Sequence, residues 1–238
     1  MRVGEDLLRL RLHLRRPVSR VPYVWDATMY ARRGKRSTLA RPGTALVIEG
    51  FPRSGNTFSV AAFRIANGPG PHLGRHLHGA PHLLRAKRLG IPAVALVRAP
   101  EDALVEYLDF YRTAWPARDA FVVALFDDVT RDFGTVIDRV NERFGTSFAR
   151  YEATTDNEAA AFSLVEEMNR QESRGEVDET KVGRPSAERS ARKAAIAASL
   201  ERPRAARRLG QARELYEQYV ALGDRAGDRR DDRAGDGS

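Results

Sequence analysis

Short apolar segments alternate along the first half of the chain with longer segments whose apolar residues recur at helical spacing. Runs of four to eight apolar residues bounded by turn signals are typical of buried strands, and we expect strands at residues 45–49, 72–78, 93–97 and 121–126. The longer segments predict helices at residues 56–65, 81–89, 101–112 and 131–144. Strands that alternate with helices indicate an α/β fold, with a central parallel sheet flanked by helices on both faces.

The C-terminal part of the chain has a different pattern, in which helical spacing dominates and strand-like runs are missing. We expect helices at residues 156–170, 185–200 and 202–222, with a polar loop at 171–183. Residues 223–238 contain no apolar side chain larger than alanine, which predicts a disordered tail. The pattern therefore predicts one α/β domain over residues 42–222 with a helical C-terminal part, because 238 residues are too few for two independent cores.

Charge is distributed unevenly along the chain. The formal net charge is +8, and residues 1–41 form a strongly basic N-terminal arm while the rest is close to neutral. Stacking aromatics are sparse in this arm, so we expect it to cover the domain or an anionic cofactor rather than to bind nucleic acid. Leucines between residues 7 and 14 would also allow a peripheral contact with a membrane. No apolar stretch approaches the length of a membrane span, and we expect a soluble cytoplasmic protein.

One loop carries most of the chemical information. Residues 50–57, Gly-Phe-Pro-Arg-Ser-Gly-Asn-Thr, have the frame of a phosphate-binding P-loop, G-x-x-x-x-G-K-[ST]. A tight glycine turn before a helix directs backbone N–H groups at an anion, and the helix dipole adds to the attraction. Asn56 stands where the P-loop lysine belongs, and the loop cation is instead Arg53. Because that lysine normally reaches the β- and γ-phosphates of a nucleoside triphosphate, the loop predicts a different anion.

Two segments resemble the sulfotransferase family. Residues 50–58 are similar to its 5′-phosphosulfate loop, and residues 93–102, a strand that ends in Arg-x-Pro-x-Asp, resemble its 3′-phosphate segment. The resemblance implies a P-loop α/β enzyme that moves a sulfuryl group from 3′-phosphoadenosine 5′-phosphosulfate to a hydroxyl or amine acceptor without a metal. It also implies the residues that bind this co-substrate: Arg53, Ser54, Gly55, Asn56, Thr57, Arg98, Lys181 and Arg184.

The resemblance further implies a catalytic cation and a catalytic base. Arg53 would lie at the bridging oxygen of the leaving group, where it can stabilise charge but cannot donate a proton. The base would be a histidine, since imidazole accepts a proton near neutral pH. The candidates are the neighbouring His72, His76, His78 and His82. His78 and His76 both fit the family's pattern, and we favour His78. No Asp or Glu lies among these histidines, so we expect no metal site there.

The chain departs from the family at two places. Glu106 stands where the family usually has a serine that shares the 3′-phosphate with Arg98, and its carboxylate would repel that group. Residues 178–180, Asp-Glu-Thr, replace the family's Arg-Lys-Gly, so Lys181, Arg184 or Arg189 would have to substitute for it. These departures put the 3′ half of the site in question.

Two other functions stay open at the level of sequence. A P-loop kinase or NTPase would use Asp127 or Asp128, after the strand at 121–126, as a magnesium ligand. A non-catalytic protein that binds anions through its basic arm would explain the departures from the family. Neither the acceptor nor the oligomeric state has a readable pattern.

Overall fold

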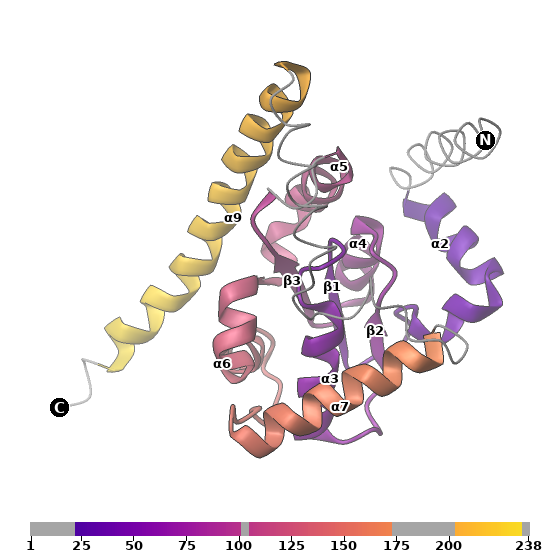
Figure 1. Cartoon of the computed structure of the whole chain (residues 1–238), viewed down its shortest axis with the longest axis vertical. Helices are drawn as coiled ribbons and strands as arrows, with labels where there is room; N and C mark the ends of the chain where they lie inside the picture. The colour runs from indigo at the N-terminus through magenta and orange to yellow at the C-terminus, as the bar shows by residue number, and fades with distance from the viewer. Residues whose placement is uncertain (1–21, 101–104, 173–202, 235–238) are drawn as a thin grey trace, which may run out of the picture.

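The computed structural model describes residues 22–100, 105–172 and 203–234. Its sheet consists of four parallel strands in the order β2-β1-β3-β4. Their bounds are β1, Leu46–Gly50; β2, Leu73–Arg75; β3, Ala93–Val97; and β4, Val122–Leu125. Figure 1 shows this sheet with helices on both sides. The predicted α/β class with a parallel central sheet is confirmed.

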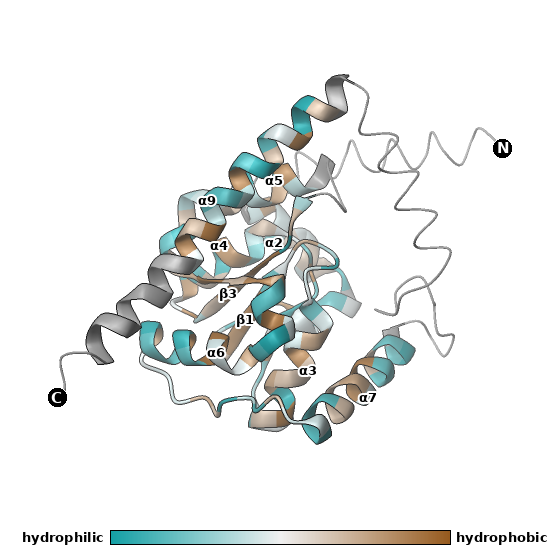
Figure 2. Cartoon of the chain, turned by 60° about the vertical axis from the view of Figure 1, so that its left-hand side comes forward, coloured by the Kyte–Doolittle hydropathy of each residue, from teal (hydrophilic) through white to brown (hydrophobic). Residues whose placement is uncertain are grey.

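Each face of the sheet has its own apolar core. One core joins alternate strand residues such as Ile48 and Leu96 to helices α3 (Asn56–Asn67), α6 (Phe126–Phe144) and α7 (Thr155–Glu172). The other joins residues such as Val47 and Ala95 to α4 (Ala80–Leu89), α5 (Val105–Ala114), the 3-10 helix η3 (Trp115–Ala120) and α9 (Pro203–Ala234). Side chains alternate between the faces of a strand, so strands covered on both sides read as continuous apolar runs. Figure 2 shows these strands as hydrophobic segments between helices whose outer surfaces are largely hydrophilic.

The largest differences from the predicted bounds among the described residues lie in β2, α6 and α9. Strand β2 ends at Arg75 instead of extending to residue 78. Helix α6 begins at Phe126, directly after β4, and has a kink at Asp132, which is close to the predicted helix start at 131. Helix α9 continues to Ala234, although residues 223–238 were expected to be disordered. No proline follows Pro203, so the polar composition of this segment does not prevent the backbone from continuing as a helix.

The second half of the basic arm is part of the folded domain. Residues 22–31 form helix α2 (Pro22–Ala31) and residues 33–38 form the 3-10 helix η1 (Arg33–Thr38). Trp25, Met29 and Leu39 are buried together in a small apolar cluster, and α2 lies against α4. The expected domain start at residue 42 is therefore too late for the described chain. Residues 22–31 contain no lysine or arginine, and the basic character assigned to this part of the arm comes from the residues on either side. None of the described helices is long and apolar enough to cross a membrane.

The close approach of β1 and β3 at Gly50 gives a stability prediction. A Cβ on Gly50 would lie 2.6 Å from the carbonyl oxygen of Leu96, on the neighbouring strand. Because backbone atoms of a central strand cannot move aside cheaply, Gly50→Ala should lower the free energy of unfolding by about 1–3 kcal/mol. Urea denaturation would measure this change.

Gly210 supplies a matched control for that substitution. It lies in α9 with nothing within 4 Å of an added Cβ, so Gly210→Ala should raise the stability by up to about 1 kcal/mol through helix propensity. Equal effects of the two substitutions would contradict the close approach at Gly50.

Candidate functional site

The strand order places one edge of the sheet in a position that favours ligand binding. From β1 the chain passes through α3 to β2 on one side, and then through α4 to β3 on the other side of β1. The order therefore reverses between β1 and β3, and ligands of open parallel sheets bind at the carboxyl ends of the strands beside such a reversal. The loop at residues 51–55 follows β1, and Arg98 follows β3. Arg98 Nη1 donates a hydrogen bond to the Arg53 carbonyl oxygen at 3.1 Å, so the two sequence-predicted segments meet.

The loop after β1 has the backbone of a tight turn. The Ser54 N–H donates to the Phe51 carbonyl at 3.2 Å, and Arg53 and Gly55 have left-handed φ angles of 72° and 86°. No side chain caps α3 at Gly55, and the first bond of the helix runs from the Ser59 N–H to the Gly55 carbonyl. The N–H groups of the first helical turn lie before this bond in the chain, at the loop, and therefore have no acceptor within the helix. This arrangement suits an anion.

Two side chains that were predicted to bind the co-substrate are turned into the protein instead. Ser54 is buried, with Oγ 3.4 Å from the hydroxyl of Tyr111, which itself donates to the Leu96 carbonyl at 2.6 Å. Burial raises the pKa of Tyr111 far above its ordinary value, so its hydroxyl stays protonated. Asn56 is also buried, and its Nδ2 donates to the Phe51 carbonyl at 3.0 Å. Both side chains therefore stabilise the loop rather than face a ligand.

Arg53 and Arg98 are the cations at this edge. Arg53 is exposed and Arg98 is half-buried, with its guanidinium 4.3 Å from the centroid of the Phe126 ring. Together with Phe51 and Tyr107 they line a cavity of about 10 Å³, which has room for about one water molecule. A nucleotide at this edge therefore requires the two guanidinium side chains to swing outward. The exposed position of Arg53 allows such a movement, whereas Arg98 would have to leave the Phe126 ring and the Arg53 carbonyl. Thr57, also predicted to bind the co-substrate, is half-buried at the start of α3.

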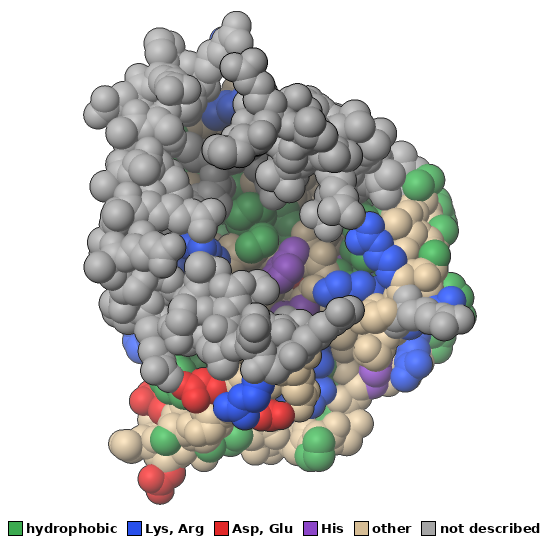
Figure 3. Space-filling view, turned by 45° about the vertical axis from the view of Figure 1, so that its right-hand side comes forward, with side chains coloured by type: hydrophobic (Ala, Val, Ile, Leu, Met, Phe, Trp, Pro, Cys, Tyr) green, Lys and Arg blue, Asp and Glu red, His purple; other side chains and the backbone are tan. Residues whose placement is uncertain are grey.

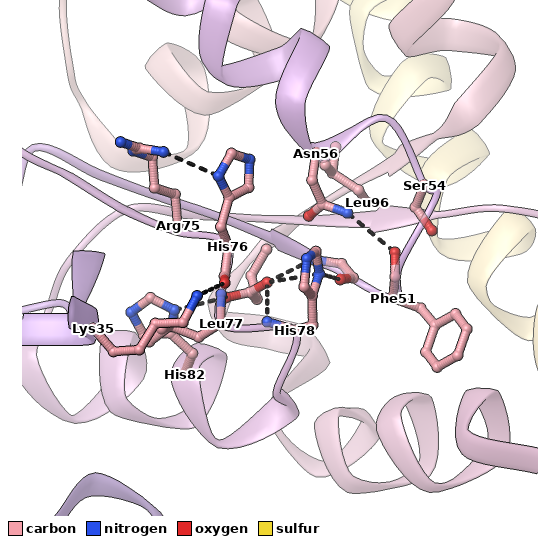
Figure 4. A network of polar contacts seen from close by, with 12 residues as sticks. Lys35, Phe51, Ser54, Asn56, Arg75, His76, Leu77, His78, His82 and Leu96 are labelled. Atoms are coloured by element: carbon pink, nitrogen blue, oxygen red, sulfur yellow. Dashed lines mark hydrogen bonds and ion pairs between the residues drawn. The ribbon is translucent and has the colours of Figure 1, made fainter. Parts of the chain in front are cut away.

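The histidine segment between β2 and α4 is not extended. His76 and His78 have φ angles of 56° and 49°, in the left-handed region that non-glycine residues rarely adopt. The expected strand over residues 72–78 therefore does not continue through these two histidines. Their rings instead stack at 6.1 Å between centroids, and Figure 4 shows both near the loop that carries Asn56. A backbone conformation with this strain persists only where contacts with the surrounding structure hold it in place.

Glu49, the penultimate residue of β1, provides the contacts that hold this segment. Its carboxylate is fully buried and accepts four hydrogen bonds. The donors are the backbone N–H groups of Leu77 at 3.1 Å, His78 at 2.9 Å and Gly50 at 3.3 Å, and the Nδ1–H of His82 at 2.8 Å. One carboxylate thus connects the end of β1, through hydrogen bonds, to the segment at residues 76–78 and to α4.

The protonation of Glu49 leads to a pH prediction. Burial alone would raise its pKa above the ordinary 4.5, but the hydrogen bonds from His82 and from backbone N–H groups outweigh burial and lower it. A carboxylate whose pKa is lowered by folding stabilises the protein above its unfolded pKa, and this contribution is lost as the pH falls through the folded pKa. Wild-type protein should therefore exceed Glu49→Gln in stability by about 1–3 kcal/mol at neutral pH.

Urea denaturation of both proteins across the acid range checks this prediction. The difference between them should shrink once the pH falls below about 4.5, the ordinary pKa of the group. A difference that stays constant or grows toward acid pH would contradict the ionised, hydrogen-bonded state of Glu49.

His82 and His72 have structural roles. The Ala40 N–H donates to His82 Nε2 at 2.9 Å, so the ring proton must be on Nδ1, which donates to Glu49. His72 Nε2 lies 3.0 Å from the Ser37 carbonyl and its Nδ1 lies 2.9 Å from the Thr44 hydroxyl. Burial is the largest of the effects that together lower the pKa of His72. Both nitrogens of each ring have protein partners, so neither ring can take a proton from a substrate.

His78 differs from these two rings. Its Nδ1 lies 3.1 Å from the Gly50 carbonyl, which can only accept a hydrogen bond. The neutral ring therefore carries its proton on Nδ1 and has a lone pair on Nε2. No described residue forms a hydrogen bond with that nitrogen, and the side chain is 38% exposed. Figure 3 shows histidine side chains at the surface, close to side chains of lysine or arginine. His78 is thus held at the last residue of β1, directly before the loop at residues 51–55, with an imidazole nitrogen available as a base.

His76 has the opposite tautomer. Its Nδ1 lies 3.0 Å from Nη1 of Arg75, and a guanidinium can only donate, so the neutral ring carries its proton on Nε2. The ring is 5% exposed. Both observations make His76 a poorer proton acceptor than His78. They distinguish the two candidates, which the sequence pattern could not separate.

Several residues that the sequence analysis assigned to the site lie outside the part of the chain that the structure describes. Lys181, Arg184 and Arg189 fall outside the described residues, as do Glu101 and Asp102, and the side chain of Glu106 in α5 is not described either. Asp127 and Asp128 begin α6, and Asp128 lies 3.7 Å from Nη2 of Arg139. Within the described ranges, no group of three or more His, Cys, Asp or Glu side chains is arranged to hold a metal ion.

The residue that sequence reasoning missed is Glu49. The sequence did contain an indication of this role, because a carboxylate stands in an otherwise apolar run that predicts a buried strand, and buried carboxylates need partners.

Comparisons with protein-family models, with curated proteins and with solved structures give no match to this chain. Its function must therefore be argued from the site itself.

Proposed function

We propose that the protein is a sulfotransferase, which moves a sulfuryl group from 3′-phosphoadenosine 5′-phosphosulfate to a hydroxyl or amine acceptor. The observation that carries the proposal is the hydrogen bond between His78 Nδ1 and the Gly50 carbonyl. In this proposal the bond would hold a general base at the last residue of β1, directly before a loop that suits an anion, so one stretch of backbone would hold both the base and the departing group.

The anion half of the proposed site consists of the loop N–H groups, Arg53 and Arg98. These two arginines follow separate strands and line the same small cavity, which suits a nucleotide that is negatively charged at both its 5′ and its 3′ substituents. Arginine forms bidentate hydrogen bonds with phosphate and sulfate oxygens. In this assignment the loop and Arg53 bind the 5′-phosphosulfate, and Arg98 binds the 3′-phosphate.

The reaction uses few groups. His78 Nε2 takes the proton of the acceptor hydroxyl or amine as that oxygen or nitrogen attacks the sulfur. The bond between the sulfur and the bridging oxygen breaks, and its electron pair stays on the 5′-phosphate of the leaving adenosine 3′,5′-bisphosphate. Arg53 and the loop N–H groups stabilise the negative charge that develops on this oxygen. Such transfers depend mainly on positioning and charge stabilisation.

A P-loop kinase is the competing assignment, and Asn56 argues against it. The lysine of a kinase loop must reach out to the β- and γ-phosphates, whereas Asn56 is buried and its amide donates back to Phe51. Asp128, one of the two candidate magnesium ligands, lies close to Arg139. Asp128 follows strand β4, and β3 lies between β4 and β1. This candidate magnesium ligand therefore does not follow a strand that neighbours β1 and its loop.

A turnover assay tests the proposal. The protein would be incubated in EDTA with phosphoadenosine phosphosulfate labelled in its sulfate, together with a panel of hydroxyl and amine acceptors. Chromatography would follow the label and adenosine 3′,5′-bisphosphate. We expect labelled product and bisphosphate to form in equal amounts without metal. Release of ADP from ATP that requires magnesium would overturn the assignment in favour of a kinase. No turnover of either nucleotide, with intact binding of anions, would favour a non-catalytic anion-binding protein.

A further inference from the structure

Helix α2 is apolar on two sides, but the protein covers only one of them. Trp25 and Met29 are buried against the domain. On the opposite side, Tyr23 is 72% exposed, Val24 47% and Tyr30 62%. Figure 1 shows α2 at the far side of the molecule from α9, beyond β2. A helix that is hydrophobic all round normally has apolar surroundings on every side, so among the residues that the structure describes the outer side of α2 lacks an apolar partner.

Cations follow the end of this helix. Arg32 and Arg36, just after α2, are exposed, and Arg36 lies over the Tyr30 ring. The only acid of α2, Asp26, is turned toward α4, where it forms ion pairs with Arg85 at 3.0 Å and with Arg88. The outer side of the helix therefore carries no acidic side chain and is flanked by positive charge.

The two exposed tyrosines are paired with arginines. The Arg36 guanidinium lies 4.7 Å from the centroid of the Tyr30 ring, and that of Arg88 lies 5.0 Å from the centroid of the Tyr23 ring. Tyr23 and Tyr30 are seven residues apart, which is about two helical turns, so both project from the same side. Tyrosines between cations combine an apolar ring, a polar hydroxyl and positive charge, as side chains at a lipid headgroup region do.

We propose that this surface, formed by Tyr23, Val24, Tyr30, Arg32 and Arg36, binds an anionic phospholipid bilayer. The helix would lie in the plane of the headgroups with its tyrosines inserted and its cations at lipid phosphates. The proposal does not depend on the enzymatic activity proposed above.

Other occupants fit the surface less well. A second copy of this chain would bring the same cations against each other. Nucleic acid would need aromatic ring faces open for base stacking, and a guanidinium already covers one face of each tyrosine. Apolar Val24 between the tyrosines also adds nothing to a phosphate backbone, whereas it suits the edge of the acyl region.

The surface is connected to the candidate site. Lys35, in η1, donates to the His76 carbonyl oxygen at 3.3 Å, and the Trp25 ring lies 5.8 Å from the ring of His82. A bilayer bound by the outer side of α2 would therefore be separated from the segment that carries His78 by this helix, whose inner side contacts that segment through Trp25.

Vesicle sedimentation of the full chain tests the inference. Vesicles of phosphatidylcholine with phosphatidylglycerol should carry the protein into the pellet at low salt. Vesicles of phosphatidylcholine alone should not, and high salt should release the protein, because screening weakens the contribution of the cations. The double variant Tyr23→Ser/Tyr30→Ser should lower the partition coefficient about tenfold, since it removes the inserted rings.

Phe162→Ser supplies the matched control. Phe162 is 60% exposed on α7, a helix outside the proposed surface, so this variant should bind vesicles as wild type does. Equal loss in the control and in the tyrosine variant would overturn the proposal, as would binding that ignores lipid charge or survives the tyrosine substitutions. Binding of RNA or DNA that depends on the two tyrosines, without binding of vesicles, would assign the surface to nucleic acid instead.

Discussion

Replacing His78 with alanine is expected to lower kcat for sulfuryl transfer about 10²- to 10⁴-fold, the usual effect of losing a general base. The acceptor must lose its proton as it attacks, and among the described histidines only His78 combines an available Nε2 with an exposed side chain. Turnover with the acceptor found in the panel would measure the loss. The fold should tolerate the change, because this side chain has a single hydrogen bond to the Gly50 carbonyl.

His76→Ala is the control for that experiment. His76 neighbours His78 and stacks against it, but its Nδ1 is occupied by Arg75 and its ring is buried. We expect its turnover to fall by less than about tenfold, by the same measure of a lost base. A larger loss in His76→Ala than in His78→Ala would transfer the role of base to His76 and contradict the tautomers assigned here.

Removing the Arg53 guanidinium should reduce kcat about 10²- to 10³-fold, by analogy with the loss of one group that stabilises charge in a transition state. Two substitutions separate the charge from the backbone. Arg53 has a left-handed φ of 72°, which glycine adopts without cost and alanine does not. Arg53→Ala and Arg53→Gly should therefore lose the same activity, while Arg53→Gly should be the more stable by about 1 kcal/mol.

Steady-state kinetics and urea denaturation of the two variants check both halves of this prediction. A loss of activity below about tenfold in both variants would remove Arg53 from the catalytic machinery, since one displaced donor costs more than that. Recovery of activity in Arg53→Gly alone would instead mean that the conformation of the loop, and not its charge, supports catalysis.

The strands could be predicted because their burial on both faces gives a direct signal. Residues 93–97 are apolar throughout, and the structure has β3 over those residues. The position of the loop could also be inferred from sequence, since glycines bound it and a helix follows. Strand β2 was overestimated because the histidines at 76 and 78 resemble an alternating strand, whereas their φ angles are set by a tertiary contact.

That tertiary contact could not be read from local sequence. Glu49 and Leu77 are far apart in the chain, and only the parallel pairing of β1 with β2 brings them within hydrogen-bond distance. The tautomer of His78 depends on the distant Gly50 carbonyl in the same way, whereas that of His76 depends on its sequence neighbour Arg75. Ser54 and Asn56 were assigned to the ligand because their positions match a motif, but burial against Tyr111 and Phe51 gives them structural roles.

Calorimetric titration of the purified protein with adenosine 3′,5′-bisphosphate, compared with ATP, tests the central claim most directly. The claim is that the loop after β1 and Arg98 after β3 bind one nucleotide through both of its phosphates. The account predicts that the bisphosphate binds in EDTA, that it binds more tightly than ATP, and that Arg53→Gly and Arg98→Ala each weaken it about tenfold or more. Tighter binding of ATP that requires magnesium, or bisphosphate binding that neither substitution changes, would contradict it.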